Sequence, residues 1–492
     1  MLLLCKSTVS PHEDSRYRRW VLANVLVGQF IAAVDTRAII ISLPTLTIEF
    51  QTDVQTLKWT FLAYHLSLVA LVLILGRIGD LVGRKKTYAL GFAVFTVASL
   101  LCGLAASVAQ LILFRIIQGV GAAMLIANGR AIISSVFPAA ERGKALGLTS
   151  TGFHLGFLTG PSVGGFLIDS FGWRWIFFLN VPIGILGTLL AWKILKESVA
   201  QTSALKLDLK GVALLVVILL SLFLGLHWVT ELGVEHFRTW SLFLIFVLGL
   251  LLLLRVETQN DQPILDLSLF RNRLYTAGNL SLFFVGLGMG ALSLFFPFYL
   301  QGIRGFSASE MGLILMADSV VIVFASPIGG WLSDRLGSRL LCTTGATLMA
   351  LAYVAIGMLQ SDSPTYQIVL AHALSGLAWA MFNSPNVSAV FSSAGPEKFG
   401  QAAGMLMTMF GVGQSVGVVV ATLILGLRIN PSGMASTAAD GLQAWRSAPG
   451  LYLWAFRTVC AFAVAAELGA VVSSAVRPPK QMAVKPEAPQ TN

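Results

Sequence analysis

The chain has 492 residues, of which 56% are hydrophobic and 11% are charged, and its mean hydropathy is +0.80. Soluble domains carry about 25% charged residues, so this composition excludes a soluble globular protein and predicts an all-α integral membrane protein. The formal net charge of +10 would suit a nucleic-acid partner, but its distribution along the chain argues against one.

Apolar stretches of the ~20 residues that a bilayer core requires recur along the whole chain. Fourteen of them are predicted to be transmembrane helices. They cover residues 21–43, 57–76, 88–108, 110–132, 146–168, 175–193, 211–229, 240–256, 275–300, 309–332, 340–360, 366–391, 402–427 and 451–474.

The basic residues indicate which side of the membrane each loop faces. Most of the 33 Lys and Arg residues fall in the loops on the same side as the two termini. The opposite loops hold only Lys58, Arg174, Arg238, Arg304, Arg428 and Arg446. Cytoplasmic loops carry such an excess of basic residues. We therefore expect a multi-pass protein of the inner (plasma) membrane with both termini in the cytoplasm, and the charge requires no nucleic acid.

The first stretch carries two charges, Asp35 and Arg37. A charge at mid-membrane costs at least ~2.5–3.5 kcal/mol, so such residues are expected to be functional and to have a partner. Asp35 is predicted to bind and release a proton or to bind a cation; the alternative is a static ion pair with Arg37 or Arg115. Residues two apart do not share a helix face, so Arg37 is expected either in a central cavity or against a neighbouring helix.

The loop after the second stretch has a pattern that returns after the tenth. Both copies fit Gly-x-(Ile/Leu)-x-Asp-x-x-Gly-x-(Lys/Arg), in which glycines allow a tight turn and the acid can cap a helix or pair with a basic residue. We predict that these loops act in gating. The residues concerned are Gly76, Asp80, Gly83 and Arg84 in the first copy, and Gly330, Asp334, Arg335, Gly337 and Arg339 in the second.

The fourth stretch contains Arg115, followed closely by Gln118. Arginine keeps its proton at physiological pH, but it can stabilise a nearby carboxylate and change partner when that acid titrates. Arg115 is therefore predicted to take part in proton coupling; the alternative is a structural tether to backbone carbonyls.

The fifth stretch is rich in glycine. Each glycine inside a helix costs roughly 1 kcal/mol relative to alanine, and glycines four residues apart share one face, where they allow close packing between helices. We predict a surface that slides or bends against a neighbour, whereas the simpler interpretation is static packing. The segment contains Gly152, Gly156, Gly160, Pro161, Gly164 and Gly165, and His154 lies within it.

The two copies of the loop pattern lie eight stretches apart, although two six-helix halves would place them six apart. An inserted helix pair explains the surplus. We predict a cytoplasmic arm over 1–20, a six-helix bundle over 21–200, a two-helix linker over 201–262, a second six-helix bundle over 263–474 and a cytoplasmic tail over 475–492. In the second bundle Asp318 is the clearest acid at depth in the membrane.

Several segments together resemble the major facilitator superfamily, in its fourteen-span drug:proton antiporter branch. The loop at 76–86 is similar to the superfamily's loop signature, and 152–165 to the antiporter signature that is typical of exporters. Residues 113–123, 173–184 and 263–273 match the branch's fourth-span arginine motif, the entry to its sixth span and its linker. Residues 34–44 depart from its first-span signature, because Arg37 replaces a Thr and Ile40 an Asn.

The resemblance implies a function and further site residues. It implies a two-bundle fold, an acid at Asp35, a part in proton transfer for Arg115, an acid for drug recognition at Asp318 and a tyrosine at Tyr64. We predict proton coupling through Asp35, Arg115 and Asp318. We predict a substrate cavity lined by Arg37, Tyr64, Gln118 and His154.

We therefore expect a proton-coupled exporter of amphipathic small molecules that works by alternating access. The alternatives are an exporter of one defined, anionic metabolite such as a siderophore or antibiotic, and, less favoured, a facilitative importer or a non-transporting sensor. Neither a phosphate-binding Gly-x-x-x-x-Gly-Lys-Ser/Thr run nor a catalytic or metal-binding spacing occurs. We expect no enzyme activity and no cofactor or metal; the partners expected are substrate, protons and lipid, and a periplasmic adaptor is left open.

Overall fold

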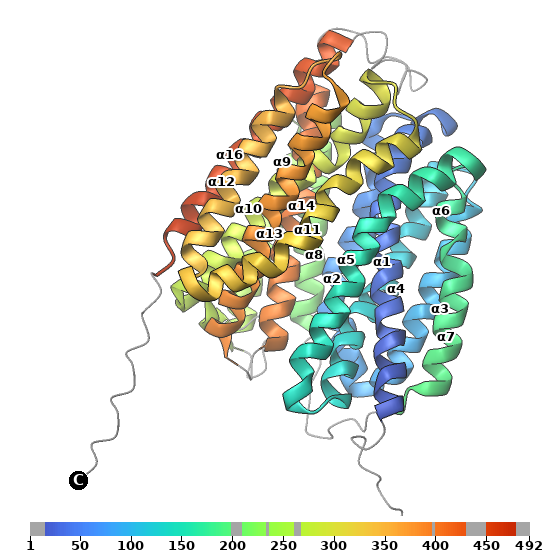
Figure 1. Cartoon of the computed structure of the whole chain (residues 1–492), viewed down its shortest axis with the longest axis vertical. Coiled ribbons are helices and arrows are strands. Elements are labelled where there is room, and N and C mark those ends of the chain that lie inside the picture. The colour runs from blue at the N-terminus through green and yellow to red at the C-terminus, as the bar shows by residue number, and fades with distance from the viewer. Residues whose placement is uncertain are drawn as a thin grey trace, which may run out of the picture.

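The computed structural model describes residues 15–197, 209–232, 236–259, 267–395, 399–429 and 449–478. All the regular secondary structure in these ranges is helical. The long helices run side by side along the long axis of the molecule (Figure 1).

The first group of helices spans residues 15–194 and is called the N-terminal bundle below. It consists of α1 (Ser15–Glu49), α2 (Val54–Val82), α3 (Arg84–Gly103), α4 (Val108–Val136), α5 (Ala139–Phe171), α6 (Trp175–Phe178) and α7 (Asn180–Ile194). Within it α1 packs on α5 and α7, and α4 packs on α2 and α3.

The last group, called the C-terminal bundle, follows a short 3-10 turn at Leu267–Arg271. It consists of α10 (Arg273–Phe298), a π-helical turn at Tyr299–Ile303, α11 (Ala308–Leu336), α12 (Ser338–Gly357), α13 (Thr365–Ala394), α14 (Phe399–Ile429) and α16 (Pro449–Ala475). Its main packing pairs are α10 with α14, α11 with α13, and α12 with α13 and α16.

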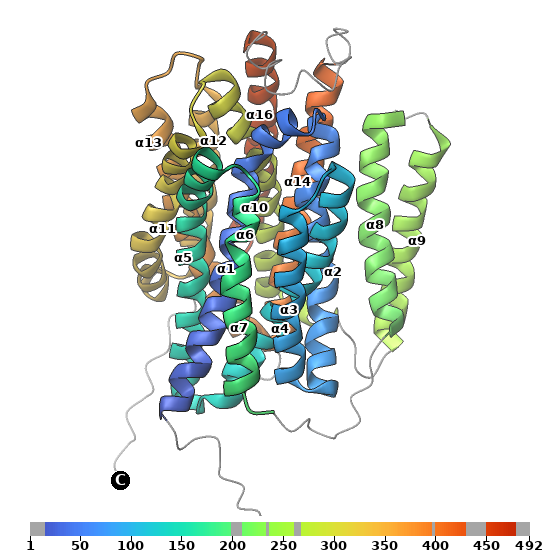
Figure 2. The same ribbon diagram turned by 90° about the vertical axis from the view of Figure 1, so that its right-hand side faces the viewer.

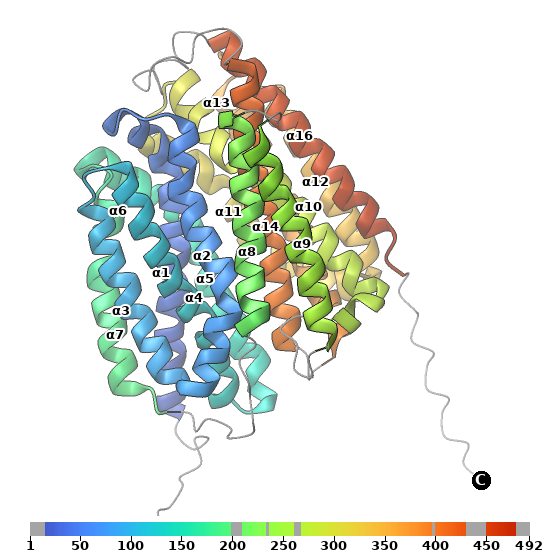
Figure 3. The same cartoon turned by 180° about the vertical axis from the view of Figure 1, so that it is seen from behind.

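Two further helices, α8 (Leu209–Leu232) and α9 (Phe237–Gln259), follow the N-terminal bundle in the sequence and precede the C-terminal bundle. They pack on each other. They lie at one side of the molecule (Figure 2). Figure 3 shows this pair over the side on which the bundles meet, where α8 contacts both α2 and α14. The linker proposed from the sequence corresponds to this pair; its boundaries, like those of the bundles, remain predictions.

Helices overlie each of the fourteen apolar stretches predicted from the sequence. Within the described residues, ten helices are long and apolar enough to cross a membrane, or eleven when the bent α2 is counted as one span. The chain is therefore a multi-pass helical membrane protein, while the number of fourteen spans remains a prediction.

Two glycines of the repeated loops divide one helix from the next. Gly83 separates α2 from α3 with a φ of 122°, and Gly337 separates α11 from α12 with a φ of 86°. Residues other than glycine rarely adopt such backbone angles. This explains why glycine occupies the same place in both copies of the loop.

Candidate functional site

Asp35 of α1 and Arg115 of α4 form a buried ion pair in the N-terminal bundle. Nη1 of Arg115 lies 2.6 Å from Oδ2 of Asp35, and the two side chains are 0% and 2% exposed. A charge without a partner at this depth would be costly, and each residue removes that cost for the other. Of the two arginines considered as partners for Asp35, the structure selects Arg115.

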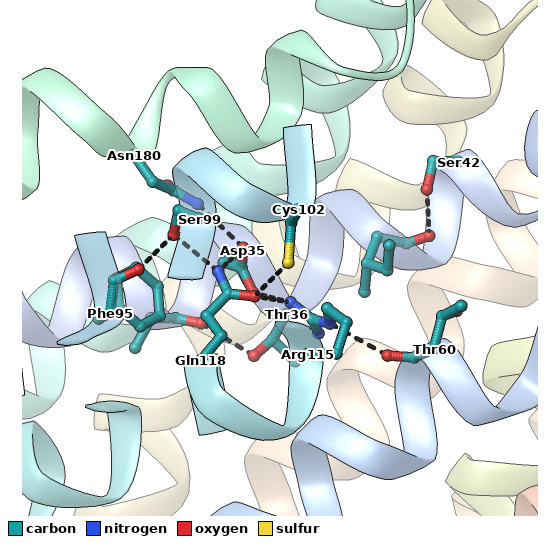
Figure 4. Close-up of polar contacts among 12 residues, drawn as sticks. Asp35, Thr36, Ser42, Thr60, Phe95, Ser99, Cys102, Arg115, Gln118 and Asn180 are labelled. Carbon is teal, nitrogen blue, oxygen red and sulfur yellow. Dashed lines mark hydrogen bonds and ion pairs between the residues drawn. The ribbon is translucent and has the colours of Figure 1, made fainter. Parts of the chain in front are cut away.

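The other carboxylate oxygen of Asp35 accepts two hydrogen bonds (Figure 4). Nε2 of Gln118 donates to Oδ1 over 2.8 Å, and Nδ2 of Asn180 donates to the same oxygen over 2.9 Å. Gln118 also donates to Oγ of Ser99 over 2.9 Å. The Asp35 carboxylate is thus held from α4 and from α7, and Gln118 extends the network to α3.

Arg115 is fixed by further contacts around its guanidinium group. Its Nε donates to the carbonyl oxygen of Thr60 over 3.0 Å, and Nη1 also donates to Oε1 of Gln118 over 2.6 Å. The guanidinium lies 4.2 Å from the ring centroid of Tyr64, in cation–π geometry. Tyr64 and Gln118 were predicted to line a cavity; both are fully buried around Arg115 in this conformation.

Asn180 was not among the predicted site residues. It is the first residue of α7, after α6 ends at Phe178 and the helix breaks at Leu179, and it is 1% exposed. An amide side chain in an otherwise apolar sixth stretch is the sequence signal that could have identified it, because buried polar groups need partners.

A second ion pair joins the two bundles. Nη2 of Arg37 on α1 lies 3.3 Å from Oδ2 of Asp318 on α11, and the side chains are 13% and 8% exposed. Oγ of Ser319 donates to the other oxygen of Asp318 over 2.7 Å. Nε2 of His372 on α13 lies 3.7 Å from Oδ2 of Asp318, and the Arg37 guanidinium stacks on Phe157 of α5 at 4.2 Å.

The structure therefore brings the predicted charged residues together as two separate pairs. Asp35 and Arg115 lie within one bundle, whereas Arg37 and Asp318 connect the bundles. His372 was not among the predicted site residues, and its place beside Asp318 could not be read from spacing in the sequence. The side chain of His154 lies outside the described residues.

The glycine-rich segment of α5 packs against two helices. A Cβ added at Gly152, Gly156, Gly160 or Gly164 would come within 2.5–3.0 Å of atoms of α1. These four glycines therefore serve contact inside the N-terminal bundle.

The end of the same segment meets the C-terminal bundle. A Cβ at Gly165 would strike the backbone of Ala308 on α11, and one at Gly312 of α11 would strike the carbonyl group of Pro161. Glycine on each helix thus permits close approach of α5 and α11 at the end of the bundles that is predicted to be external.

Hydrogen bonds fasten the bundles near the same end. The carboxylate of Asp169 on α5 accepts from the backbone N–H groups of Ala308 and Ser309, over 3.3 and 2.7 Å, at the N-terminus of α11. Nε2 of Gln55 on α2 donates to the carbonyl oxygen of Thr422 on α14 over 2.7 Å. We call these α5–α11 and α2–α14 contacts the external seal.

Lys58 also belongs to the external seal. It was assigned to an external loop from the sequence, but it lies in the second turn of α2 and is fully buried. Its Nζ donates to Oε1 of Gln55 over 2.8 Å and to Oγ1 of Thr422 over 3.4 Å.

The repeated loops lie at the opposite ends of α2 and α11. In the first copy, Nε of Arg84 lies 2.7 Å from Oδ1 of Asp80, and Nη1 donates to the carbonyl oxygen of Ala131 over 3.1 Å. The acid of this loop therefore pairs with its basic residue. Gly76 faces Ala127 on α4, where an added Cβ would make ordinary contact at 3.4 Å.

In the second copy, the Arg335 guanidinium stacks on the ring of Trp331 at 4.0 Å. An added Cβ at Gly330 would lie 3.1 Å from Oγ of Ser384 on α13. Arg339 lies in the first turn of α12 and is exposed. The side chain of Asp334 lies outside the described residues, so the Asp80–Arg84 ion pair of the first copy cannot be compared with the second copy.

The family assignment follows from comparison with known proteins. The model of the Major Facilitator Superfamily matches residues 25–257 and 278–490. The chain belongs to this superfamily and is therefore a membrane transporter by family.

Relatives include transporters for different substrates. The chain is 33% identical to the riboflavin transporter RibZ of Clostridioides difficile over 393 residues, 80% of this chain and 85% of the relative. It is 28% identical to the multidrug transporter protein MdtP of Bacillus subtilis, over 84% of this chain and 76% of the relative. It is 27% identical to the tetracenomycin C resistance and export protein of Streptomyces glaucescens, over 85% of this chain and 78% of the relative.

Among solved structures, the chain is similar to a bacterial homologue of the human lysosomal transporter Spinster, in an inward-facing and unoccupied conformation. The TM-score is 0.67 at 17% identity, and the match covers 94% of this chain and 98% of the other. A D-xylose–proton symporter matches with a TM-score of 0.59 at 15% identity, over 91% of this chain and 97% of the symporter. At these identities the similarity establishes the fold.

Proposed function

We propose that the protein is a proton-driven exporter of amphipathic small molecules that alternates access between the two sides of the membrane. Relatives named as multidrug transporters and as an antibiotic export protein support export. The observation that carries the proposal is the Arg37–Asp318 ion pair, because it joins one bundle to the other through a group that a proton can neutralise.

Protonation of Asp318 would remove one charge of this pair and leave Arg37 without its counter-ion. The attraction between α1 and α11 would fall at this level, and separation of the bundles would become less costly. A ligand can shift an equilibrium between two conformations only by its differential affinity for them. A proton on Asp318 meets this condition, since it abolishes a contact that exists in the conformation described here.

Asp35 is proposed as a second coupling acid inside the N-terminal bundle. Its network connects α1, α3, α4 and α7 through Arg115, Gln118 and Asn180. A proton on Asp35 would release Arg115, which has Thr60 and Gln118 as remaining partners. The packing of these helices would then change in response to proton occupancy.

The external seal fits alternating access in the same way. Its contacts lie at the predicted external ends of α2, α5, α11 and α14, so they would close the pathway on that side. Opening to the outside would require these contacts to break together with the Arg37–Asp318 pair. For export, cargo bound from the cytoplasm would break the pair in this direction, and a proton taken up by Asp318 from the outside would take the place of the cargo for the return.

Export of one defined metabolite is the second candidate. The relative named as a riboflavin transporter favours it, as does the stacking of Arg37 on Phe157, a surface suited to a flat, polar ring system. An anionic or strongly hydrogen-bonding cargo would bind Arg37 and free Asp318, whereas a lipophilic cation would bind Asp318 and free Arg37.

Purified protein in proteoliposomes with an imposed pH gradient tests both candidates. We expect ethidium movement to be driven by the gradient and abolished by Asp318→Asn, while the exposed acid change Asp362→Asn leaves it intact. Movement of riboflavin but not ethidium, lost on Arg37→Gln, would select the second candidate. Substrate transport that is independent of the pH gradient would instead indicate a facilitative transporter, and substrate binding without transport would indicate a sensor.

A further inference from the structure

Glu467 is a buried acid on α16 that takes no part in the sites described above. Its exposed fraction is zero, and neither carboxyl oxygen has a hydrogen-bond partner among the described residues. No described Lys, Arg or His forms an ion pair with it.

The carboxyl group occupies a space formed by three helices. A Cβ added at Gly288 of α10 would lie 2.9 Å from Oε1 of Glu467 and 3.0 Å from Cε2 of Tyr353 on α12. The same Cβ would lie 3.3 Å from the carbonyl oxygen of Ala463, one turn earlier on α16. The absence of a side chain at residue 288 therefore makes room for the acid.

In the part of the chain that the structure describes, few titratable groups surround Glu467 and none of them is positively charged. Tyr353 faces it from α12, and Cys460 lies two turns earlier on its own helix. On the α10 side, Gly288 and Phe284 pack against α16. Tyr353 and Glu467 therefore meet at Gly288, where α10, α12 and α16 pack together.

This setting differs from those of the two acids described above. Asp35 has a cation and two amide donors, and Asp318 has a cation and a hydroxyl donor. Both are stabilised as carboxylates. An ionised carboxylate with neither cation nor donor in an apolar interior is very costly, so Glu467 is suited to the neutral, protonated form.

We propose that Glu467 is a further proton-binding site, protonated in the conformation described here and able to release its proton when α10, α12 and α16 rearrange. Binding forms one O–H bond on a carboxyl oxygen, and release breaks it. No hydrogen bond to a described residue fixes that proton. The contribution to transport rests on the proposed proton coupling, whereas the protonation itself does not.

Infrared difference spectroscopy on the purified full-length protein tests the protonation. We expect the carbonyl band of a protonated carboxylic acid to be present in the wild type and lost in Glu467→Gln. Asp35→Asn should leave the band unchanged, because Asp35 is paired with Arg115. Persistence of the whole band in Glu467→Gln would overturn the proposal.

Covalent labelling gives a second readout that does not require the variant to be stable. Dicyclohexylcarbodiimide, an apolar reagent, reacts with protonated carboxyl groups inside membranes. Peptide mass mapping of the wild type should find the adduct on Glu467 and not on Asp35. Gly288→Ala should reduce that labelling, since its Cβ would crowd Oε1; labelling of Asp35 with none on Glu467 would contradict the proposal.

Proton counting then separates a transporting role from a fixed proton. Proteoliposomes containing a pH dye report how many protons move per ethidium. We expect fewer in Glu467→Gln than in the wild type, together with a shifted pH profile, and an unchanged ratio and profile would show a proton that never leaves. If the wild type itself moves no protons, the proposed function fails while the spectroscopic result for Glu467 still stands.

Discussion

Arg37 of α1 and Asp318 of α11 are 281 residues apart in the chain and form an ion pair of 3.3 Å across the two bundles. Each charge is the partner of the other, and both side chains are largely withdrawn from the surface. The pair is therefore at once a stabilising contact and a place where a single proton changes how the bundles interact.

The energetic coupling of this pair is the first prediction. Removing one member of a buried pair leaves an unpaired charge and costs more than removing both. Arg37→Gln and Asp318→Asn should each lower the melting temperature in detergent, and the double variant should lose less than the sum. The expected coupling is about 0.5–3 kcal/mol, the range for contacting residues. Strict additivity would show that the two side chains do not interact.

The pH dependence of transport is the second prediction. Asn at residue 318 imitates a permanently protonated carboxyl group, so Asp318→Asn should make the bundle contact insensitive to protons. Initial rates of substrate exchange across the membrane without an imposed pH gradient, measured over a range of pH, should lose the step that Asp318 contributes in the wild type. The exposed change Asp362→Asn serves as control and should keep the wild-type profile.

Arg115 is predicted to be intolerant of lysine. Its guanidinium reaches Asp35, Gln118 and the carbonyl group of Thr60 at once, whereas a lysine ammonium is a single point charge. Arg115→Lys should be inserted in the membrane at normal levels but should lose transport nearly as fully as Arg115→Gln. Recovery of transport by lysine would show that positive charge alone is sufficient at this position.

The sequence predicted the helices far better than their partners. Hydropathy located a helix at every apolar stretch, and the depth of Asp35, Arg115 and Asp318 in those stretches identified them as candidates. It could not show that Arg37 pairs with Asp318, because contact across bundles depends on how the two halves dock. Nor could it distinguish Glu467, which is buried and has no partner among the described residues, from an acid at a helix surface, since both have the same spacing in the sequence.

Lys58 and Asn180 illustrate the same limit at shorter range. Lys58 lies at the start of an apolar stretch, where a basic residue normally reaches the membrane surface; its burial results from the meeting of α2 with α14. Asn180 is a functional candidate only because α7 begins beside α1. Contacts of this kind are set by tertiary packing and leave no periodic signal.

The hydrogen bonds that Asp169 accepts from α11 are predicted to control the external seal. Ser307 and Glu310 form the local capping box of α11, and Asp169 of α5 adds bonds from the backbone N–H groups of Ala308 and Ser309; a hydrogen bond to a charged group contributes about 1.5–3 kcal/mol. Asp169→Ala should therefore shift the protein toward conformations in which α5 and α11 separate at this end. Spin labels at the exposed residues Phe171 and Leu313 should report a longer mean distance. An unchanged distance distribution would show that the α2–α14 contacts are sufficient to hold the seal.

Gly160 is predicted to be essential for transport because of its position against Arg37. A Cβ at residue 160 would lie 2.7 Å from Cβ of Arg37 and 3.2 Å from the carbonyl oxygen of Val34. Gly160→Leu should push α1 away from α5 and displace Arg37 from Asp318, so the protein should remain inserted but lose efflux. Leu155→Ala, at an exposed position of the same helix, is the matched control and should transport normally. Normal efflux by Gly160→Leu would show that the glycine-rich segment serves packing alone. A partial loss of efflux in the smaller change Gly160→Ala, beside full loss in Gly160→Leu, would show that the approach of α5 to α1 determines the position of Arg37.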